Sequence, residues 1–203
     1  HIEGRYVVNA AGASGGKAIA RQVGLEVPIE SRKRATFVFE TREEGLSGAP
    51  LTVLPEGLAF RPEGTGFLCN LAPTEENDPE CFDYDIDYND FDERMWPILA
   101  SRIPAFEAIK LTGAWCCHYD LNTFDENAII GSAGPDNFYV LLGVSGHGLQ
   151  QSPAMGRATA ELIVHDAFQT IDLRRFGLDR VAENRPIVES NCYSVSYTHL
   201  TLP

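Results

Sequence analysis

The sequence contains no long apolar run. Among its 203 residues, stretches such as 138–142 are far shorter than the roughly 20 apolar residues of a membrane-spanning helix, so no membrane span is expected. Positive charge is also scarce, because 16 Lys and Arg stand against 29 Asp and Glu, for a formal net charge of −13. Nucleic-acid phosphates are bound largely by Lys and Arg, so this composition argues against a nucleic-acid partner.

Cysteine is sparse and odd in number. The five cysteines show no disulfide-framework spacing, which indicates a reducing compartment. Cys116 and Cys117 are adjacent and followed by His118, but no second Cys or His pair stands at zinc spacing, so no metal site is expected. We expect both cysteines to be buried small apolar residues. His118 is either a hydrogen-bonded structural residue or a general base.

The apolar pattern predicts alternating strands and helices. A buried strand is expected at 6–13, followed by a short helix at 14–24 that ends at Gly24. Short apolar stretches between 34 and 71, separated by Gly, Pro and Glu, predict an antiparallel sheet. Further strands are expected near 111–123 and 138–142, with a helix from about Pro153 to Ala167.

The segment 74–93 is rich in Asp and Glu and has neither Lys nor Arg. Asp83, Asp85 and Asp87 alternate in a way that suggests calcium, but an EF-hand loop needs Gly and Glu where Tyr88 and Arg94 stand. We therefore predict a half-exposed strand with a solvated acidic face, followed by a helix. The apolar face of that strand would carry Phe82, Tyr84, Ile86 and Tyr88. The helix would be capped by Asn89 and would bury Phe91, Met95, Trp96, Leu99 and Ile103.

Two features allow a ligand-binding and a structural interpretation. The loop Gly-Val-Ser-Gly-His-Gly (143–148) joins a strand to a helix, where glycine lets backbone N–H groups approach a ligand. The same loop also serves as a plain tight connection. Arg61 lies in an apolar strand, either as an edge arginine or as a bidentate clamp for a substrate carboxylate.

The order of these motifs resembles the D-amino-acid-oxidase-like superfamily of flavoproteins, which includes sarcosine oxidases, glycine oxidases and dimethylglycine dehydrogenases. The matching segments are "VVNAAGA", "FRPEGTGFL", the pattern W-x-x-x-Y-x-x-x-T-x-D-x-x-x-I-I-G, and G-x-S-G-H-G-x-x-x-x-P-A-x-G. They extend from about Tyr6 to Glu189. "YDLNTFDENAIIG" and "GVSGHGLQQSP" are also similar to the mitochondrial FAD-dependent oxidoreductase domain-containing proteins.

The resemblance implies an α/β fold with an α+β substrate lobe, in which an antiparallel-sheet substrate domain is inserted into a partial FAD-binding Rossmann-like domain. Residues 1–33 and 112–190 would belong to the FAD-binding domain and 34–111 to the substrate-binding domain. Residues 191–203, which resemble a translated adaptor, would be a non-native or disordered tail. The chain would be a C-terminal portion of the enzyme, itself inactive.

The cofactor implied by the resemblance is FAD. Ala11, Gly12 and Ala13 would pass near its diphosphate or adenosine, and the 146–148 backbone would lie along the isoalloxazine ring. The N-terminus of the following helix would lie near the ring O2. The cofactor-binding candidates in the second motif are Gly143, Ser145, Gly146, His147, Gly148, Leu149 and Gln150.

The implied reaction is oxidation of the C–N bond of a small N-methylated or cyclic amino acid, with hydride transfer to flavin N5. His147 and His118 are the catalytic candidates, and Arg61, Tyr119 and Gln150 are the substrate-binding candidates. A non-catalytic flavin-bearing assembly protein is the alternative. The expected location is mitochondrial, otherwise cytoplasmic.

The sequence departs from the family at several positions. The G-x-G-x-x-G unit is absent, Ser14 replaces the usual Trp, and Gln150 stands where sarcosine oxidases carry a carboxylate-binding Lys. "GTGFLCNL" lacks their oxygen-activating Lys. Their covalent flavin cysteine falls at Cys117 or His118. These departures leave the substrate, the oxidase activity and covalent attachment open.

Overall fold

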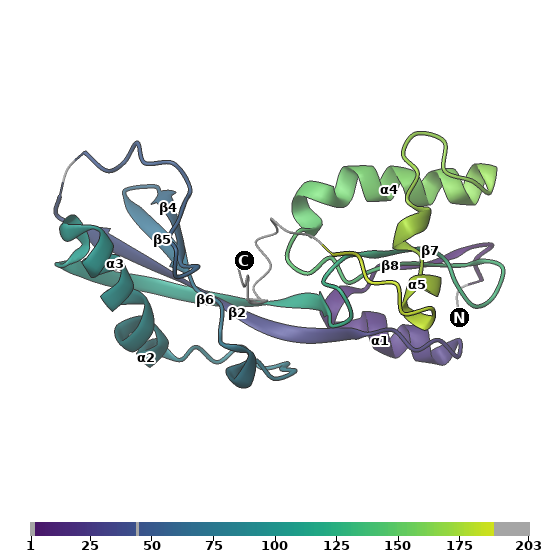
Figure 1. Cartoon of the computed structure of the whole chain (residues 1–203), viewed down its shortest axis with the longest axis horizontal. Coiled ribbons are helices and arrows are strands. Elements are labelled where there is room, and N and C mark those ends of the chain that lie inside the picture. Colours follow the sequence, from purple (N-terminus) through teal and green to yellow (C-terminus); the bar gives the residue numbers. More distant parts are fainter. Residues whose placement is uncertain (1–2, 44, 189–203) are drawn as a thin grey trace, which may run out of the picture. The chain divides into compact units, whose positions relative to one another are not determined.

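The computed structural model describes residues 3–43 and 45–188, which form two compact units (Figure 1). Of these residues, unit 1 contains 3–32 and 118–188, and unit 2 contains 33–43 and 45–117. The predicted domain boundaries followed residues 33 and 111, whereas the units divide after Arg32 and Cys117. The predicted tail at 191–203 lies outside the described residues.

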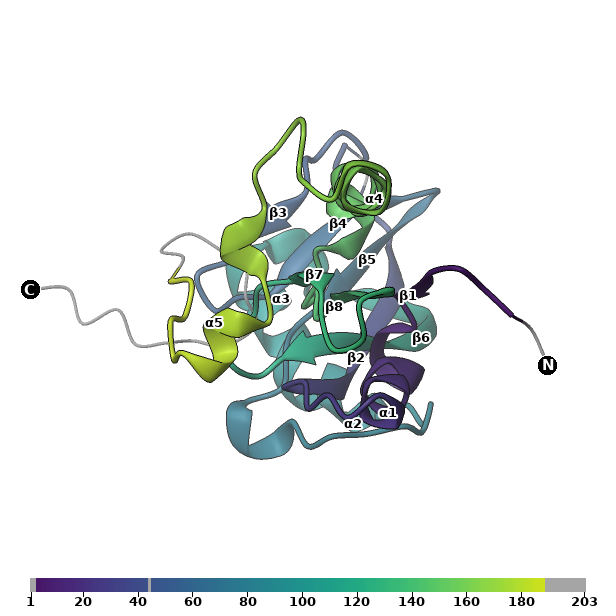
Figure 2. The ribbon, with the colours of Figure 1, turned by 90° about the vertical axis from the view of Figure 1, so that its right-hand side faces the viewer.

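Unit 1 is built on a three-stranded sheet in the order β1 (Val7–Asn9), β8 (Phe138–Leu142) and β7 (Ile129–Ser132). β1 and β8 are parallel, and β7 is antiparallel to β8. Helices α1 (Gly12–Gln22) and α4 (Gly148–His165) lie on opposite faces of this sheet (Figure 2). The fold is therefore mixed α/β, as predicted.

Side-chain alternation along β8 fills both faces of the sheet. Phe138, Val140 and Leu142 pack with Ala20 of α1, whereas Leu141 packs with the cluster that includes Met155 of α4. Gly16 lets α1 approach the sheet closely, because a Cβ there would lie 2.4 Å from the Leu142 side chain. Gly16 is thus needed for helix–sheet packing.

Helix α4 begins at Gly148, five residues before the predicted start at Pro153. Proline has no N–H for the carbonyl one turn earlier and is a common reason to end or begin a helix. Here the Ser152 hydroxyl donates to the Leu149 carbonyl at 3.0 Å, which supplies the missing donor. The glycine motif therefore forms the helix N-terminus itself.

A buried ion pair holds the C-terminal part of unit 1. The side chains of Arg180, in α5 (Asp179–Ala182), and Asp125 are each 1% exposed. The guanidinium donates to both Asp125 oxygens at 2.8 and 2.9 Å and also to the Phe176 carbonyl of η4 (Arg174–Phe176). Burial raises the pKa of Asp125, but Arg180 and the Ile187 N–H outweigh this and leave it lowered.

Unit 2 contains an antiparallel sheet with an aromatic core. The strand order is β3 (Thr52–Val53), β4 (Ala59–Glu63), β5 (Gly66–Asn70), β2 (Ile29–Thr41) and β6 (Ile109–Asn122). Phe106, in the 3-10 turn η3 (Pro104–Phe106), lies 5.1 Å from Phe39 and 5.0 Å from Phe67 between ring centroids. Edge-to-face contacts of this kind stabilise the core beyond area burial.

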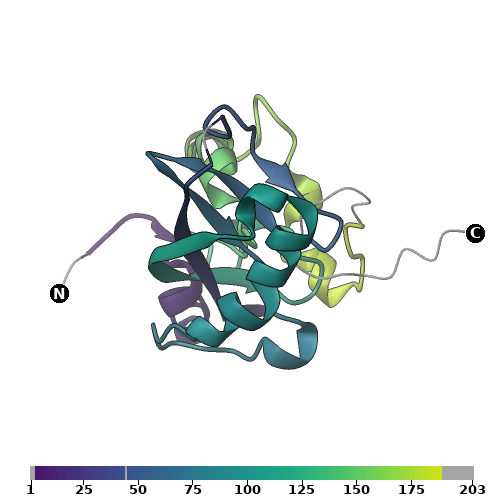
Figure 3. The same cartoon turned by 90° about the vertical axis from the view of Figure 1, so that its left-hand side faces the viewer.

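The helical part of unit 2 covers one face of this sheet (Figure 3). It comprises the short 3-10 turn η1 (Glu75–Asn77), α2 (Tyr88–Asp90), the π-helical η2 (Phe91–Met95) and α3 (Trp96–Arg102). Phe91, Met95 and Leu99 are buried, which confirms the predicted inner face, but Trp96 is 39% exposed. Asp87 caps the helix by accepting from the Asn89 N–H at 3.0 Å, so Asn89 is not the cap.

The prediction of a strand at the acidic segment was wrong. Residues 81–87 have no regular secondary structure, and Phe82, Tyr84 and Tyr88 are 59%, 65% and 52% exposed. Asp83 instead binds the Lys33 ammonium. This segment is therefore held by the side chain of Lys33 on β2, which binds Asp83 and the Asp85 carbonyl. Within residues 81–87 the backbone hydrogen bonds of the predicted strand are not formed.

The cysteines also differ from expectation. Cys117 is exposed and Cys116 is half-buried, both on β6, so neither is a core residue. Of the four cysteines in the described ranges, Cys69 is the buried one, and burial raises the pKa of its thiol to about 12. Among the described residues no group of His, Cys, Asp or Glu could hold a metal ion. The same part of the chain contains no helix suited in length and apolarity to spanning a membrane.

Candidate functional site

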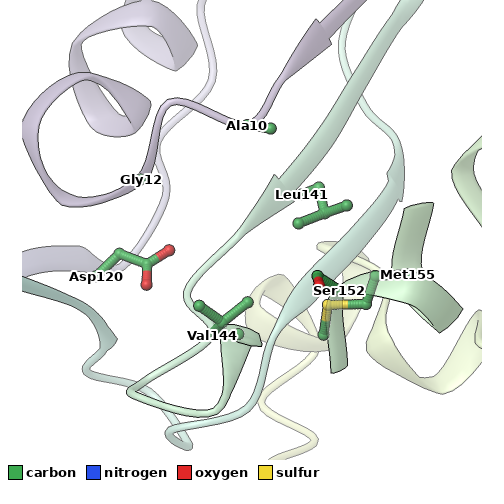
Figure 4. Close-up of a pocket in the computed structure, with 8 residues that line it drawn as sticks. Ala10, Gly12, Asp120, Leu141, Val144, Ser152 and Met155 are labelled. Carbon is green, nitrogen blue, oxygen red and sulfur yellow. The ribbon is translucent and has the colours of Figure 1, made fainter. Parts of the chain in front are cut away.

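A cavity of about 220 Å³ lies in unit 1 where α1 and α4 begin. Its walls come from the end of β1, the start of α1, the end of β6, β8, the loop that follows β8 and the first turns of α4. The residues that line it are Ala10, Gly12, Asp120, Leu141, Val144, Gly148, Ser152 and Met155 (Figure 4). The glycine motif and the N-terminal "NAAGA" motif therefore meet at one site, although 130 residues separate them in the sequence.

Two of the predicted cofactor-binding glycines, Gly12 and Gly148, line this cavity for different reasons. Gly12 has φ +57°, and a Cβ there would have no protein atom within 4 Å. A Cβ on Gly148 would instead lie 2.6 Å from a Val144 methyl carbon. Glycine at position 12 thus leaves space open toward the cavity, whereas glycine at position 148 relieves internal crowding.

The other glycines of the loop are also explained by packing within unit 1. A Cβ on Gly143 would lie 2.6 Å from Ile29 Cδ1, and one on Gly146 would lie 2.5 Å from the Tyr119 ring. Both glycines have positive φ, as does Ser145 between them. Glycine at these two positions therefore avoids clashes with Ile29 of β2 and Tyr119 of β6.

The two helices present open N-termini to the cavity. Within the described residues, no side chain caps α1 or α4, and neither helix has an acidic residue in its first turn. The first-turn N–H groups of a helix have no partner within the helix, and the dipole gives this end partial positive charge. The arrangement suits hydrogen-bond acceptors and negative charge.

β6 holds the loop in place through Asp120. The Asp120 carboxylate accepts from the Gly143 N–H at 2.8 Å, and the Ser145 N–H donates to the Asp120 carbonyl at 3.2 Å. Asp120 is 8% exposed. Burial raises the pKa of its carboxyl group, while hydrogen bonds from the Val144 and Gly143 backbone oppose the shift.

A second cavity of about 340 Å³ shares two of its lining residues, Val144 and Met155, with the first. It brings together His147 and Gln150, two of the predicted site residues. Its remaining lining residues are Glu126, Asn127, Ala128, Ile130, Gln151, Ala154, Leu173 and Phe176. This volume is within the range of about 300–1,000 Å³ typical of small-molecule sites.

The other predicted residues do not line either cavity. Ala11 and Ala13 flank Gly12, and Leu149 is 89% exposed in the first turn of α4. His118 and Tyr119 lie half-buried on β6, where Tyr119 packs against Gly146.

Arg61 lies on β4 in unit 2. Its guanidinium is partly exposed and binds Glu63 of the same strand, and it also donates to the Pro62 carbonyl at 3.1 Å. Those contacts are compatible with the edge-arginine interpretation. Its role as a carboxylate clamp stays a prediction.

Sequence reasoning missed Asp120 and the apolar walls of the first cavity, namely Leu141, Val144 and Met155. Asp120 had a usable signal, because it is an acidic residue at the end of a strand just ahead of the predicted motif at 123–131. The apolar walls had none, since their helix and strand periodicity is that of ordinary core residues.

Comparison with known proteins points to one family by two routes, a family profile and similar protein sequences. A sequence profile of the family described as DAO, FAD dependent oxidoreductase, matches residues 1–162. The chain is 42% identical over 193 residues to FAD-dependent oxidoreductase domain-containing protein 1 of Bos taurus, and 36% identical over 203 residues to that of Xenopus laevis. These matches cover 88% and 94% of this chain but 40% and 41% of the relatives. The chain thus spans about two fifths of their length.

Solved structures share the fold. L-proline dehydrogenase from P. horikoshii matches with a TM-score of 0.75 at 20% identity, covering 90% of this chain and 48% of that chain. Iminodiacetate oxidase from Chelativorans sp. matches with a TM-score of 0.73 at 16% identity, covering 87% and 46%. Glycine oxidase from Geobacillus kaustophilus matches with a TM-score of 0.71 at 20% identity, covering 85% and 45%.

Proposed function

The chain belongs to the DAO family of FAD-dependent oxidoreductases, and from this premise we propose that the full-length protein oxidises the C–N bond of a small N-methylated or cyclic amino acid. FAD is the cofactor that the family indicates. The observation that carries the proposal is the meeting of Gly12, Gly148 and two uncapped helix N-termini at one cavity.

The residues present fit part of FAD. Gly12 leaves open space at the cavity, and the ends of α1 and α4 suit phosphate oxygens or the carbonyl oxygens of a flavin ring. Leu141, Val144 and Met155 provide apolar surface for an aromatic ring. The volume of about 220 Å³ is below the range of about 300–1,000 Å³ for small-molecule sites, so these residues would enclose only a portion of the cofactor.

When bound, FAD supplies the redox chemistry by accepting a hydride from the substrate. The residues of this chain would supply its surroundings. The α4 N-terminus would stabilise negative charge at the cofactor, because helix dipoles are fixed in place before the reaction. The apolar walls would exclude water, which strengthens that electrostatic effect. The loop would be held in position by Asp120 and by the bond from the Asn122 N–H to the Ser145 hydroxyl oxygen at 3.0 Å.

The substrate class is supported by chemical likeness among proteins with this fold. Three of them are named for proline, iminodiacetate and glycine, and each of these molecules carries an amine nitrogen and a carboxylate. In this chain His147 and Gln150 line the second cavity and are the candidates for contacting such a substrate. Arg61 remains the candidate for its carboxylate. A mitochondrial location is part of the same proposal and draws on the resemblance alone.

The test is anaerobic reduction of the flavin in the full-length protein. The FAD-loaded protein is mixed separately with sarcosine, dimethylglycine and proline, and the absorbance of oxidised flavin is followed. The control is methoxyacetate, in which an ether oxygen replaces the amine of sarcosine. The proposal expects loss of absorbance with at least one amino acid and none with methoxyacetate. Stable flavin absorbance with all of them, at full occupancy, would favour the non-catalytic flavin-bearing alternative.

A further inference from the structure

Asp120 places a buried carboxylate, rather than a neutral side chain, at the first cavity. Within the residues that the structure describes, it is the one titratable side chain that lines the first cavity. Its carboxylate lies across the cavity from Leu141 and Met155 (Figure 4). The same part of the chain provides no Lys, Arg or His that forms an ion pair with it; its contacts are backbone N–H groups.

Other titratable groups occur on the elements that meet here. They are His118 and Tyr119 on β6, Lys17 on α1, and His147 immediately before α4. None of them lines this cavity. The buried pair of Asp125 and Arg180 in the same unit shows the contrast, because there a guanidinium compensates the carboxylate. Burial without such a guanidinium raises the pKa of the Asp120 carboxyl group, so a further negative charge nearby would favour its protonation.

We propose that Asp120 is the proton acceptor of the cofactor cavity and takes up a proton when the cofactor is reduced. The inference rests on the proposed function, since it requires a cofactor in this cavity that gains negative charge. A like charge nearby makes a carboxylate bind its proton more tightly. The Gly143 and Val144 N–H groups hold the carboxylate at the cavity wall, so protonation does not require the loop to move.

The charge balance of the reaction is complete with this step. The substrate C–H bond breaks and its electron pair leaves with the hydrogen to FAD. The nitrogen lone pair forms the C=N bond of an iminium cation, so the step is the same for a secondary amine such as sarcosine and a tertiary amine such as dimethylglycine. The Asp120 carboxylate takes one proton from solvent and becomes a neutral carboxylic acid. One hydride leaves the substrate, which becomes a cation, while the cavity gains no net negative charge beyond that of oxidised FAD and ionised Asp120.

The test measures the midpoint potential of FAD in the full-length protein by reductive titration against reference dyes between pH 5 and 9. No substrate is added, so failure of the proposed substrate class does not affect the result. One extra proton per two electrons adds about 30 mV per pH unit to the slope, which is the tenfold change converted for a two-electron couple. Wild type should show this steeper slope over part of the range. Asp120→Asn should lack it, and Asp120→Glu should retain it.

Equal slopes in wild type and Asp120→Asn would overturn the inference. If Asp120→Asn does not hold FAD, the wild-type protein alone decides the question. Its reduced-minus-oxidised infrared spectrum should contain the carbonyl band of a protonated carboxylic acid that shifts when aspartate is labelled with ¹³C. Absence of such a band at every pH in the range would exclude proton uptake by an aspartate. Full-length protein that binds no FAD at all would instead contradict the proposed function.

Discussion

Replacing Gly12 by alanine separates cofactor contact from backbone strain. Gly12 and Gly24 lie at the two ends of α1, with φ of +57° and +77°, and a Cβ at either position would have no protein atom within 4 Å. Alanine in this left-handed region costs roughly 1–2 kcal/mol at either site. The two substitutions should therefore lower stability by similar amounts. They differ in that Gly12 lines the cavity and Gly24 does not.

The expected difference in FAD affinity follows from the hydrogen bonds at this helix end. A methyl group at position 12 would hold a bound phosphate or ring away from the first-turn N–H groups. Loss of one hydrogen bond to a charged group costs about 1.5–3 kcal/mol. At about 1.4 kcal/mol per tenfold, Gly12→Ala should weaken FAD binding by roughly 10- to 150-fold. Gly24→Ala should bind FAD as wild type does.

The assay is fluorescence titration of FAD into full-length apoprotein, with thermal unfolding of each variant as the control for folding. The reasoning requires similar melting temperatures for the two variants and different dissociation constants. Equal affinity of Gly12→Ala and Gly24→Ala for FAD would refute the assignment of Gly12 to the cofactor site. Unequal melting temperatures would show that the two positions are not matched in strain.

Three further changes test other parts of the account in the full-length protein. Arg180→Met should destabilise unit 1 by about 3–5 kcal/mol, because it leaves the Asp125 carboxylate buried and unpaired. Since the folded pKa of Asp125 is lowered, this loss, measured as melting temperature against pH, should shrink as the pH falls below about 4. Gly148→Ala should cost about 1–3 kcal/mol in thermal unfolding by overpacking against Val144, and Val144→Ala in the same protein should restore most of it. Arg61→Lys should lower kcat/KM for a carboxylate substrate because the planar fork is lost, and unchanged steady-state kinetics would return Arg61 to an edge role.

The sequence predicted the elements that depend on local pattern. The strand at 138–142 and the buried face of Phe91, Met95 and Leu99 have regular periodicity, and the structure confirms both. The start of α4 was misplaced because Pro153 is a strong boundary signal. Its effect is offset by the Ser152 hydroxyl, a contact that depends on the helix already being formed.

The acidic segment shows a different limit. Alternation at 82–88 resembles a strand, but Lys33 of β2 lies 50 residues before Asp83 in the sequence and binds it in unit 2. No local pattern specifies such a long-range ion pair. The first cavity shows the same limit, because Asp120 and Gly12 meet only through the packing of unit 1. The motifs could be recognised from the sequence. Why glycine stands at each position could be seen only from the side chains that surround it in the structure.

The most direct measurement of the central claim is a structure of the full-length protein with FAD bound. The account predicts that part of the cofactor fills the cavity between Gly12 and Gly148, within hydrogen-bonding distance of first-turn N–H groups of α1 or α4, with Asp120 at its edge. FAD bound elsewhere, with this cavity holding only water, would contradict the assignment of the site.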